Sequence, residues 1–221
     1  MQIWKIESGT RSAAAAAMMA GHPNDADPAS LRNLPFTLHM GAEDGAYDRN
    51  KVAAAWGEKL AALEASDPGA YIHHVQIHEG KGHWMERDDA LAVPWMAQYT
   101  RNLRPKRIVW QQDDVVHERF YWLKMEDPQP RSRIVVEREG NAIKILEAKD
   151  VQALRIRLDA GMVDFSKEVV VTFADQELFR GMVQADQDVR RATLRERGDP
   201  RGIWDAEIRL ALPQAEAGSE D

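Results

Sequence analysis

The chain has 221 residues, 44% of them hydrophobic and 29% charged, with a formal net charge of −7 at pH 7 and no cysteine. This length supplies the core of one large or two modest domains, and an acidic balance spread over both halves argues against nucleic-acid binding. The lack of cysteine excludes disulfides, thiolate zinc sites and a cysteine nucleophile, and it leaves the cellular compartment open.

The N-terminal stretch, residues 1–30, is rich in alanine, and its longest apolar run is Ala13–Ala20. A bilayer-spanning helix needs about 20 apolar residues, so this run is too short to cross a membrane. A secretory signal would contain more leucine and a cleavage site after the run, so no signal peptide is predicted and the chain as it stands is expected to be cytoplasmic. We expect a short helix over the alanines and then a loop at Gly21–Asp25.

A strand, a helix and a second strand are predicted next. Leu34–Met40 is a compact apolar run that ends at a glycine, which is typical of a buried strand in a parallel sheet. Apolar residues at helical spacing predict a helix over Asn50–Ser66, and Tyr71–His78 is rich in residues that favour strands. A last helix is expected over Ala90–Thr100. Residues 1–104 are therefore predicted to form a partial parallel α/β domain.

After residue 104 the pattern changes to a period of two, with apolar residues alternating with polar or charged ones. Many short antiparallel strands with one solvated face are typical of a β-sandwich. The expected fold is thus α/β plus all-β, with a β-sandwich-like domain over residues 105–212 and a flexible tail over residues 213–221. The expected strands are Arg107–Trp110, Arg119–Leu123, Arg133–Glu137, Ala142–Glu147, Ala153–Leu158, Glu168–Phe173, Glu177–Phe179, Val189–Leu194 and Ile203–Leu210.

Two short motifs in the first domain carry chemistry: Gly41-Ala42-Glu43-Asp44 and Gly80-Lys81-Gly82-His83-Trp84. Each follows a predicted parallel strand, and the carboxyl ends of such strands meet at one edge of a sheet. Asp44 would fix the tautomer of His83, and His83 would act as general base and then general acid. The competing interpretation is a strand-closing turn and a loop with a packed histidine. A second acid, Asp48, fits better as a surface partner or helix cap.

Leu34–Trp84 resembles the final strand, helix and strand of the α/β-hydrolase fold, in which Gly-x-x-Asp bears the triad acid and a later Gly-His bears the triad histidine. The likeness is to bacterial esterases and peptidase-like hydrolases related to dienelactone hydrolase and prolyl oligopeptidase, and it covers about residues 13–104. It implies a serine hydrolase of carboxylic esters or peptides, with Asp44 and His83 as catalytic residues. The segments that carry it are Asn33–Phe36, His39–Asp44 and His78–Met85.

The nucleophile that this family requires is absent from its expected place, because no serine of the chain lies in a Gly-x-Ser-x-Gly turn. The chain alone is therefore expected to be inactive unless a nucleophile-bearing segment completes the site for a small ester or peptide substrate. The alternative is a non-catalytic module for binding or assembly. A partial sheet leaves the strand at Leu34 without a neighbour, which favours a homo-oligomer. The seven serines are Ser8, Ser12, Ser30, Ser66, Ser132, Ser166 and Ser219.

Histidines cluster in this domain, and we considered a metal site. His73 and His74 point to opposite faces of a strand, and no carboxylate completes a ligand spacing with His78 and His83. No metal, cofactor, nucleic acid or membrane is therefore predicted as a partner.

Overall fold

The computed structural model describes residues 14–21 and 26–213. Contacts between residues divide the chain into two compact units, Met1–Asn102 and Leu103–Asp221, and each unit has its own apolar core. The fold has mixed α/β content, with a parallel sheet in the first unit and two largely antiparallel sheets in the second. Across the described ranges, no helix combines the length and the apolar character that a membrane crossing requires.

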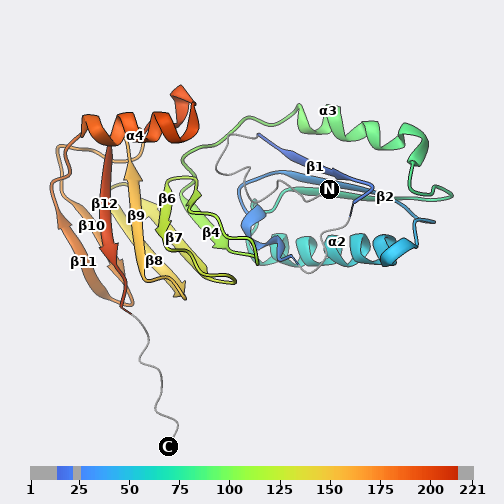
Figure 1. The fold of residues 1–221 in the computed structure, drawn as a ribbon, viewed down its shortest axis with the longest axis horizontal. Helices are drawn as coiled ribbons and strands as arrows, with labels where there is room; N and C mark the ends of the chain where they lie inside the picture. The colour runs from blue at the N-terminus through green and yellow to red at the C-terminus, as the bar shows by residue number, and fades with distance from the viewer. Residues whose placement is uncertain (1–13, 22–25, 214–221) are drawn as a thin grey trace, which may run out of the picture. The chain divides into compact units, whose positions relative to one another are not determined.

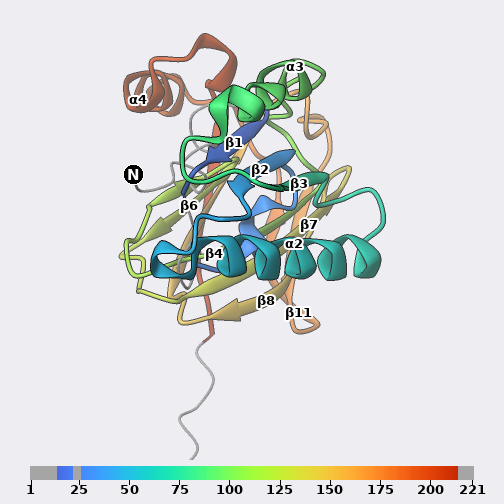
Figure 2. The same ribbon diagram turned by 90° about the vertical axis from the view of Figure 1, so that its right-hand side faces the viewer.

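The first unit is built on a three-stranded parallel sheet in the order β1-β2-β3. Its strands are β1 (Ala16–Met19), β2 (Phe36–Gly41) and β3 (His73–His78). Helix α2 (Arg49–Ser66) lies on one face of this sheet and α3 (Ala92–Met96) lies on the opposite face, as Figures 1 and 2 show from two directions. Short helical turns η1 (Pro28–Leu31), η2 (Ala46–Asp48) and η3 (Met85–Leu91) complete the unit.

Alternation along β2 sends two kinds of side chain to the two covered faces. Phe36, Leu38 and Met40 belong to the apolar cluster that includes Trp56 of α2, whose ring lies 5.6 Å from that of Phe36. Thr37 and His39 point to the other face. Because helices cover both faces, every residue of β2 is buried, as parallel sheets require.

The alanine-rich segment is a strand, so the helix expected there is wrong where the structure describes it. Ala16–Met19 pairs in parallel register with Phe36–His39, and Met18 is buried. Helix propensity is a weak preference that tertiary pairing overrides. Since β1 occupies the edge of β2, the expectation that β2 lacks its neighbour is wrong as well. The part of that prediction that concerns residues 1–13 lies outside the described residues.

The last helix of the first unit is shorter than the Ala90–Thr100 that its sequence predicts. An irregular turn, η3, precedes α3, and Met85, Glu86 and Arg87 have φ values of +30°, +52° and +75°. Successive side-chain-bearing residues at positive φ exclude a regular helix before Ala90. Within the predicted span, only Ala92–Met96 is α-helical.

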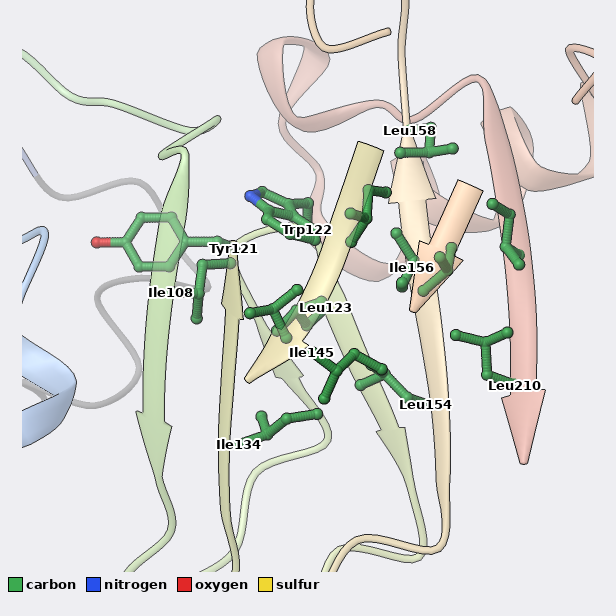
Figure 3. Packing of buried hydrophobic residues seen from close by; sticks show 14 of the residues in the cluster. Ile108, Tyr121, Trp122, Leu123, Ile134, Ile145, Leu154, Ile156, Leu158 and Leu210 are labelled. Carbon is green, nitrogen blue, oxygen red and sulfur yellow. The ribbon is translucent and has the colours of Figure 1, made fainter. Parts of the chain in front are cut away.

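The second unit contains a five-stranded sheet, β11-β10-β8-β7-β4, and a four-stranded sheet, β12-β9-β6-β5. Residues of both sheets enter one apolar cluster, and Figure 3 shows Ile134 and Ile145 of the first sheet gathered with Leu154 and Ile156 of the second. Most pairs are antiparallel, but β8 and β10 are parallel, which corrects a purely antiparallel expectation. The strands are β4 (Arg107–Gln111), β5 (Arg119–Phe120), β6 (Leu123–Glu126), β7 (Arg133–Glu139), β8 (Ala142–Lys149), β9 (Ala153–Leu158), β10 (Val169–Phe173), β11 (Gln176–Gly181) and β12 (Ala206–Ala211).

The segment expected as a strand at Val189–Leu194 is instead part of helix α4 (Gln187–Arg197), which the short turn η4 (Pro200–Gly202) follows. The Asp186 carboxylate caps its start by accepting a 2.7 Å hydrogen bond from the amide of Asp188. Gly198, at φ +62°, ends it in the left-handed conformation that glycine favours. These capping residues fix the helix.

Candidate functional site

Asp44 and His83 lie on adjacent loops at the carboxyl end of the first unit's sheet. Asp44 follows β2, His83 follows β3, and Asp44 Oδ2 is 2.8 Å from His83 Nδ1. The Asp44 side chain is 4% exposed, whereas that of His83 is 43% exposed. The buried carboxylate therefore holds a histidine that solvent can reach.

Backbone contacts fix the two loops against each other. The amide of Ala42 donates to the carbonyl of His78, and the amide of Glu43 donates to the carbonyl of Lys81, both at 2.9 Å. Asn50, at the start of α2, donates its side-chain amide to the Ala42 carbonyl at 2.7 Å. The loop that bears Asp44 is thus attached to β3, to the His83 loop and to α2.

Gly41→Ala is expected to pull these loops apart. A Cβ on Gly41 would lie 2.2 Å from the carbonyl oxygen of Gly82 and 2.4 Å from that of Lys81. Since both oxygens are backbone atoms of the His83 loop, that loop must move, at a cost of about 1–3 kcal/mol. Urea unfolding will show the loss of stability, and NMR of the His83 Nδ1 proton will show the weakened hydrogen bond to Asp44.

Gly82→Ala is the matched control, because a Cβ there meets no atom within 4 Å. If Gly41→Ala left both readouts at the values of the Gly82→Ala variant, the close approach would not hold the site together.

The electrostatics of the site favour an ionised Asp44. Burial alone would raise its pKa, but hydrogen bonds from His83 and Arg49, together with the Arg49 charge, outweigh burial and hold the pKa below its usual value. The Arg49 guanidinium lies 3.2 Å from Asp44 Oδ1, so the two carboxylate oxygens have different partners. A carboxylate beside Nδ1 favours the tautomer that keeps the proton on Nδ1 and leaves Nε2 as the base.

The outer nitrogen of His83 is available for chemistry. Within the described residues, Nε2 has no hydrogen-bond partner and no serine hydroxyl contacts the ring. Trp84 is 86% exposed, and its ring lies 5.7 Å from that of His83. Tyr47, 81% exposed, has its ring 5.2 Å from the Arg49 guanidinium that contacts Asp44. A small molecule can therefore approach His83 beside an exposed aromatic ring.

Asp48, the competing acid, does not join the site. Its carboxylate pairs with Lys51 at 2.8 Å, and both side chains are largely exposed.

A second histidine group lies between the sheet and α3. It includes His74 and His78 of the histidine cluster that the sequence shows, together with His39, which was not considered as part of that cluster. Thr37 Oγ1 is 2.9 Å from His39 Nε2 and 3.2 Å from His74 Nδ1, and His39 Nδ1 is 3.0 Å from His78 Nε2. We call these four residues the histidine chain. Side chains alternate between the two faces of a strand, so Thr37 and His39 lie on the same face of β2. The register with β3 places His74 beside Thr37 on that face.

His39, at the centre of the histidine chain, is uncharged at neutral pH in the folded protein. Burial of His39, reinforced by the neighbouring His74 and His78, lowers its pKa from 6.5 to about 4, although Asp89 opposes the shift. No group of three or more potential ligands with the geometry to hold a metal ion occurs among residues 14–21 and 26–213.

Comparison with known proteins shows a similarity over part of the chain. The chain is 31% identical over 88 residues to a 5-oxoprolinase subunit from Pectobacterium atrosepticum. The match covers 39% of this chain and 34% of the relative, so it spans about a third of that protein's length. No protein-family model matches the chain, and no solved structure matches it.

This match overturns the resemblance to α/β-hydrolases. The similar protein is part of a 5-oxoprolinase, which is a different type of hydrolase from the dienelactone hydrolase and prolyl oligopeptidase group. The prediction that this chain is the incomplete second half of a serine esterase or peptidase with a Ser-Asp-His triad is therefore wrong. Gly-x-x-Asp and Gly-His motifs at strand ends are short, and the same edge of a parallel sheet serves unrelated enzymes.

Proposed function

We propose that Asp44 and His83 act as an acid–base pair in the hydrolysis of an amide by water. The observation that carries this proposal is the 2.8 Å contact between the buried Asp44 carboxylate and His83 Nδ1, with Nε2 unpartnered among the described residues and the ring open to solvent. An oriented imidazole with a free nitrogen is the most common general base in enzymes.

In the proposed reaction His83 Nε2 takes a proton from water while the water oxygen bonds to the amide carbon. The imidazolium, paired with Asp44, then gives that proton to the amide nitrogen as the carbon–nitrogen bond breaks. The immediate products are a carboxylic acid and an amine, and the histidine returns to its starting state. The acid's proton then passes to the amine, which leaves a carboxylate and an ammonium group. Asp44 keeps its negative charge throughout, which its lowered pKa supports.

The relative's name indicates the substrate class. That protein is named for 5-oxoproline, a five-membered ring amide that also carries a carboxylate. We propose a ring amide of this kind as the substrate here, because its hydrolysis needs both a base for water and an acid for the leaving nitrogen.

The test uses the purified chain and the interconversion of 5-oxoproline and glutamate, followed from either side toward equilibrium. His83→Ala should lower the rate by about 10²-fold or more, the usual contribution of a general base. Asp48→Asn should leave it unchanged, since that carboxylate pairs only with exposed Lys51. A chain without His83-dependent turnover would contradict the proposal.

For the second unit we propose a β-sandwich. The support is that strands of its two sheets contribute to a single apolar cluster that includes Ile134 and Ile156. An experimental structure in which strand pairing closes the two sheets into one barrel would contradict it.

We also propose that copies of the chain associate through β3. Among the described strands β3 pairs only with β2, and an unpaired strand edge favours association. Light scattering at micromolar concentration should give the mass of a dimer. A clean monomer mass would rule this association out.

A further inference from the structure

An open pocket of about 430 Å³ is lined by residues of β3 and of the turn η3, the elements that precede and follow the His83 loop in the chain. Two of its residues, Gln76 and His78, are neighbours on one face of β3, which leads directly into the His83 loop. Lys81 of that loop contacts Asp88 of the pocket lining, with its Nζ 3.4 Å from Asp88 Oδ2. The lining consists of Gln76, His78, Arg87, Asp88, Ala90 and Leu91.

The pocket lining contains one cation, Arg87, and one anion, Asp88. Asp88 and Glu86 both lie within ion-pair distance of Lys81. Arg87 has no ion-pair or hydrogen-bond partner in the described part of the chain, and it is exposed at the pocket wall. A guanidinium in this situation offers a planar pair of donors that fits a carboxylate.

The pocket has polar groups at one end. His78 is 6% exposed, its Nε2 is held by His39 at 3.0 Å, and its Nδ1 has no partner among the described residues. When His39 donates through Nδ1–H, the neutral His78 ring carries its own proton on Nδ1 and can donate it into the pocket. The side-chain amide of Gln76 is a second donor at this end, whereas Leu91 provides an apolar wall.

The backbone that places Arg87 is strained. Met85, Glu86 and Arg87 all have positive φ, a conformation that costs about 1–3 kcal/mol per residue and that clusters at ligand-binding sites. An arginine without a partner among the described residues, a buried histidine donor and a strained segment therefore coincide at one pocket.

We propose that this pocket binds the carboxylate of the substrate, with Arg87 as its counter-ion and with Gln76 and His78 as hydrogen-bond donors. The inference rests on the proposed function, because it adds the recognition of a free carboxylate to the hydrolysis of a nearby amide. It selects amides that carry a carboxylate over neutral amides.

Calorimetric titration of the full chain with 5-oxoproline and with its primary amide tests the proposal. The wild-type chain should bind the acid about 10-fold or more tightly than the amide, and Arg87→Gln should remove that preference while leaving the affinity for the amide unchanged. Arg191→Gln is the matched control, since Arg191 is an exposed arginine of α4 with an Asp188 partner. Circular dichroism will verify that each variant is folded.

Equal affinity for acid and amide, or an Arg87→Gln variant that keeps the preference, would overturn the carboxylate site. Binding and turnover, measured on the Arg87→Gln and His83→Ala variants, separate the two proposals. If the acid preference depends on Arg87 but turnover does not depend on His83, the carboxylate site stands and the proposed reaction falls. If turnover depends on His83 and the acid preference is absent, the reverse holds.

Discussion

Asp44→Asn is expected to lower the rate of the proposed amide hydrolysis by about 10²–10⁴-fold. The carboxylate accepts a hydrogen bond from His83 Nδ1 at 2.8 Å, and its charge stabilises the imidazolium that forms when Nε2 takes a proton. Asparagine keeps the size of the side chain but removes that charge, and its NH₂ group can force the opposite tautomer, in which Nε2 carries the proton and cannot act as a base. The loss should appear in kcat, because Asp44 is buried behind His83 and is not expected to contact the substrate.

The rate measurement needs a test of folding beside it. Asp44 has a lowered pKa in the folded state, so its ionised form stabilises the protein at neutral pH, and that contribution is lost as pH falls through the folded pKa. Urea unfolding of the variant at neutral pH will show whether the fold survives the substitution. Arg49→Gln removes the other partner of Asp44 and leaves the His83 contact in place, so it should reduce the rate far less. Equal losses for the two variants would mean that the carboxylate acts only through the structure of the loop.

The sequence predicted the layout of the first unit well where hydrophobic spacing was regular. Helix α2 was expected at Asn50–Ser66 and begins one residue earlier, and β2 and β3 largely coincide with the predicted runs. Because parallel strands end at one sheet edge, the strand ends alone indicated that Asp44 and His83 would be neighbours. The family did not follow from that geometry, since unrelated enzymes share it.

Two elements were missed for different physical reasons. The alanines of β1 have the highest helix propensity, and only pairing with β2, a tertiary effect, makes them a strand. Helix α4 was missed although its signals are local, with Asp186 at the N-cap, Arg195 and Arg197 in the last turn, and Gly198 after it. Its apolar residues were instead assigned to the strand pattern that surrounds them.

The contacts within the histidine chain could not be predicted from single segments of the sequence. His39 was part of an apolar run, and its contacts with His74 and His78 arise from the register between β2 and β3. Register depends on the whole sheet. The group of buried histidines was therefore visible only once the strands were paired.

Burial of His39 makes the stability of the protein sensitive to mild acid. The pKa of His39 falls from 6.5 to about 4 on folding, so the unfolded chain binds more protons in this range and stability is lost as pH drops below about 6.5. The free energy of unfolding should decrease by about 2 kcal/mol between pH 7 and pH 5, and the full effect, near pH 4, is about 3 kcal/mol. Urea unfolding at these pH values measures it.

His39→Gln identifies the group responsible, because glutamine does not titrate yet keeps polar atoms near Thr37 and His78. In that variant the free energy of unfolding should change little between pH 7 and pH 5, even if the variant is less stable than the wild type at both pH values. His117→Gln, in the second unit, should retain the full decrease. Since His74, His78 and Asp89 are the titratable groups that act on His39, an unchanged pH dependence in His39→Gln would assign the acid sensitivity elsewhere. The free energy needed to protonate His39 while it stays buried is thus the physical basis of the expected transition.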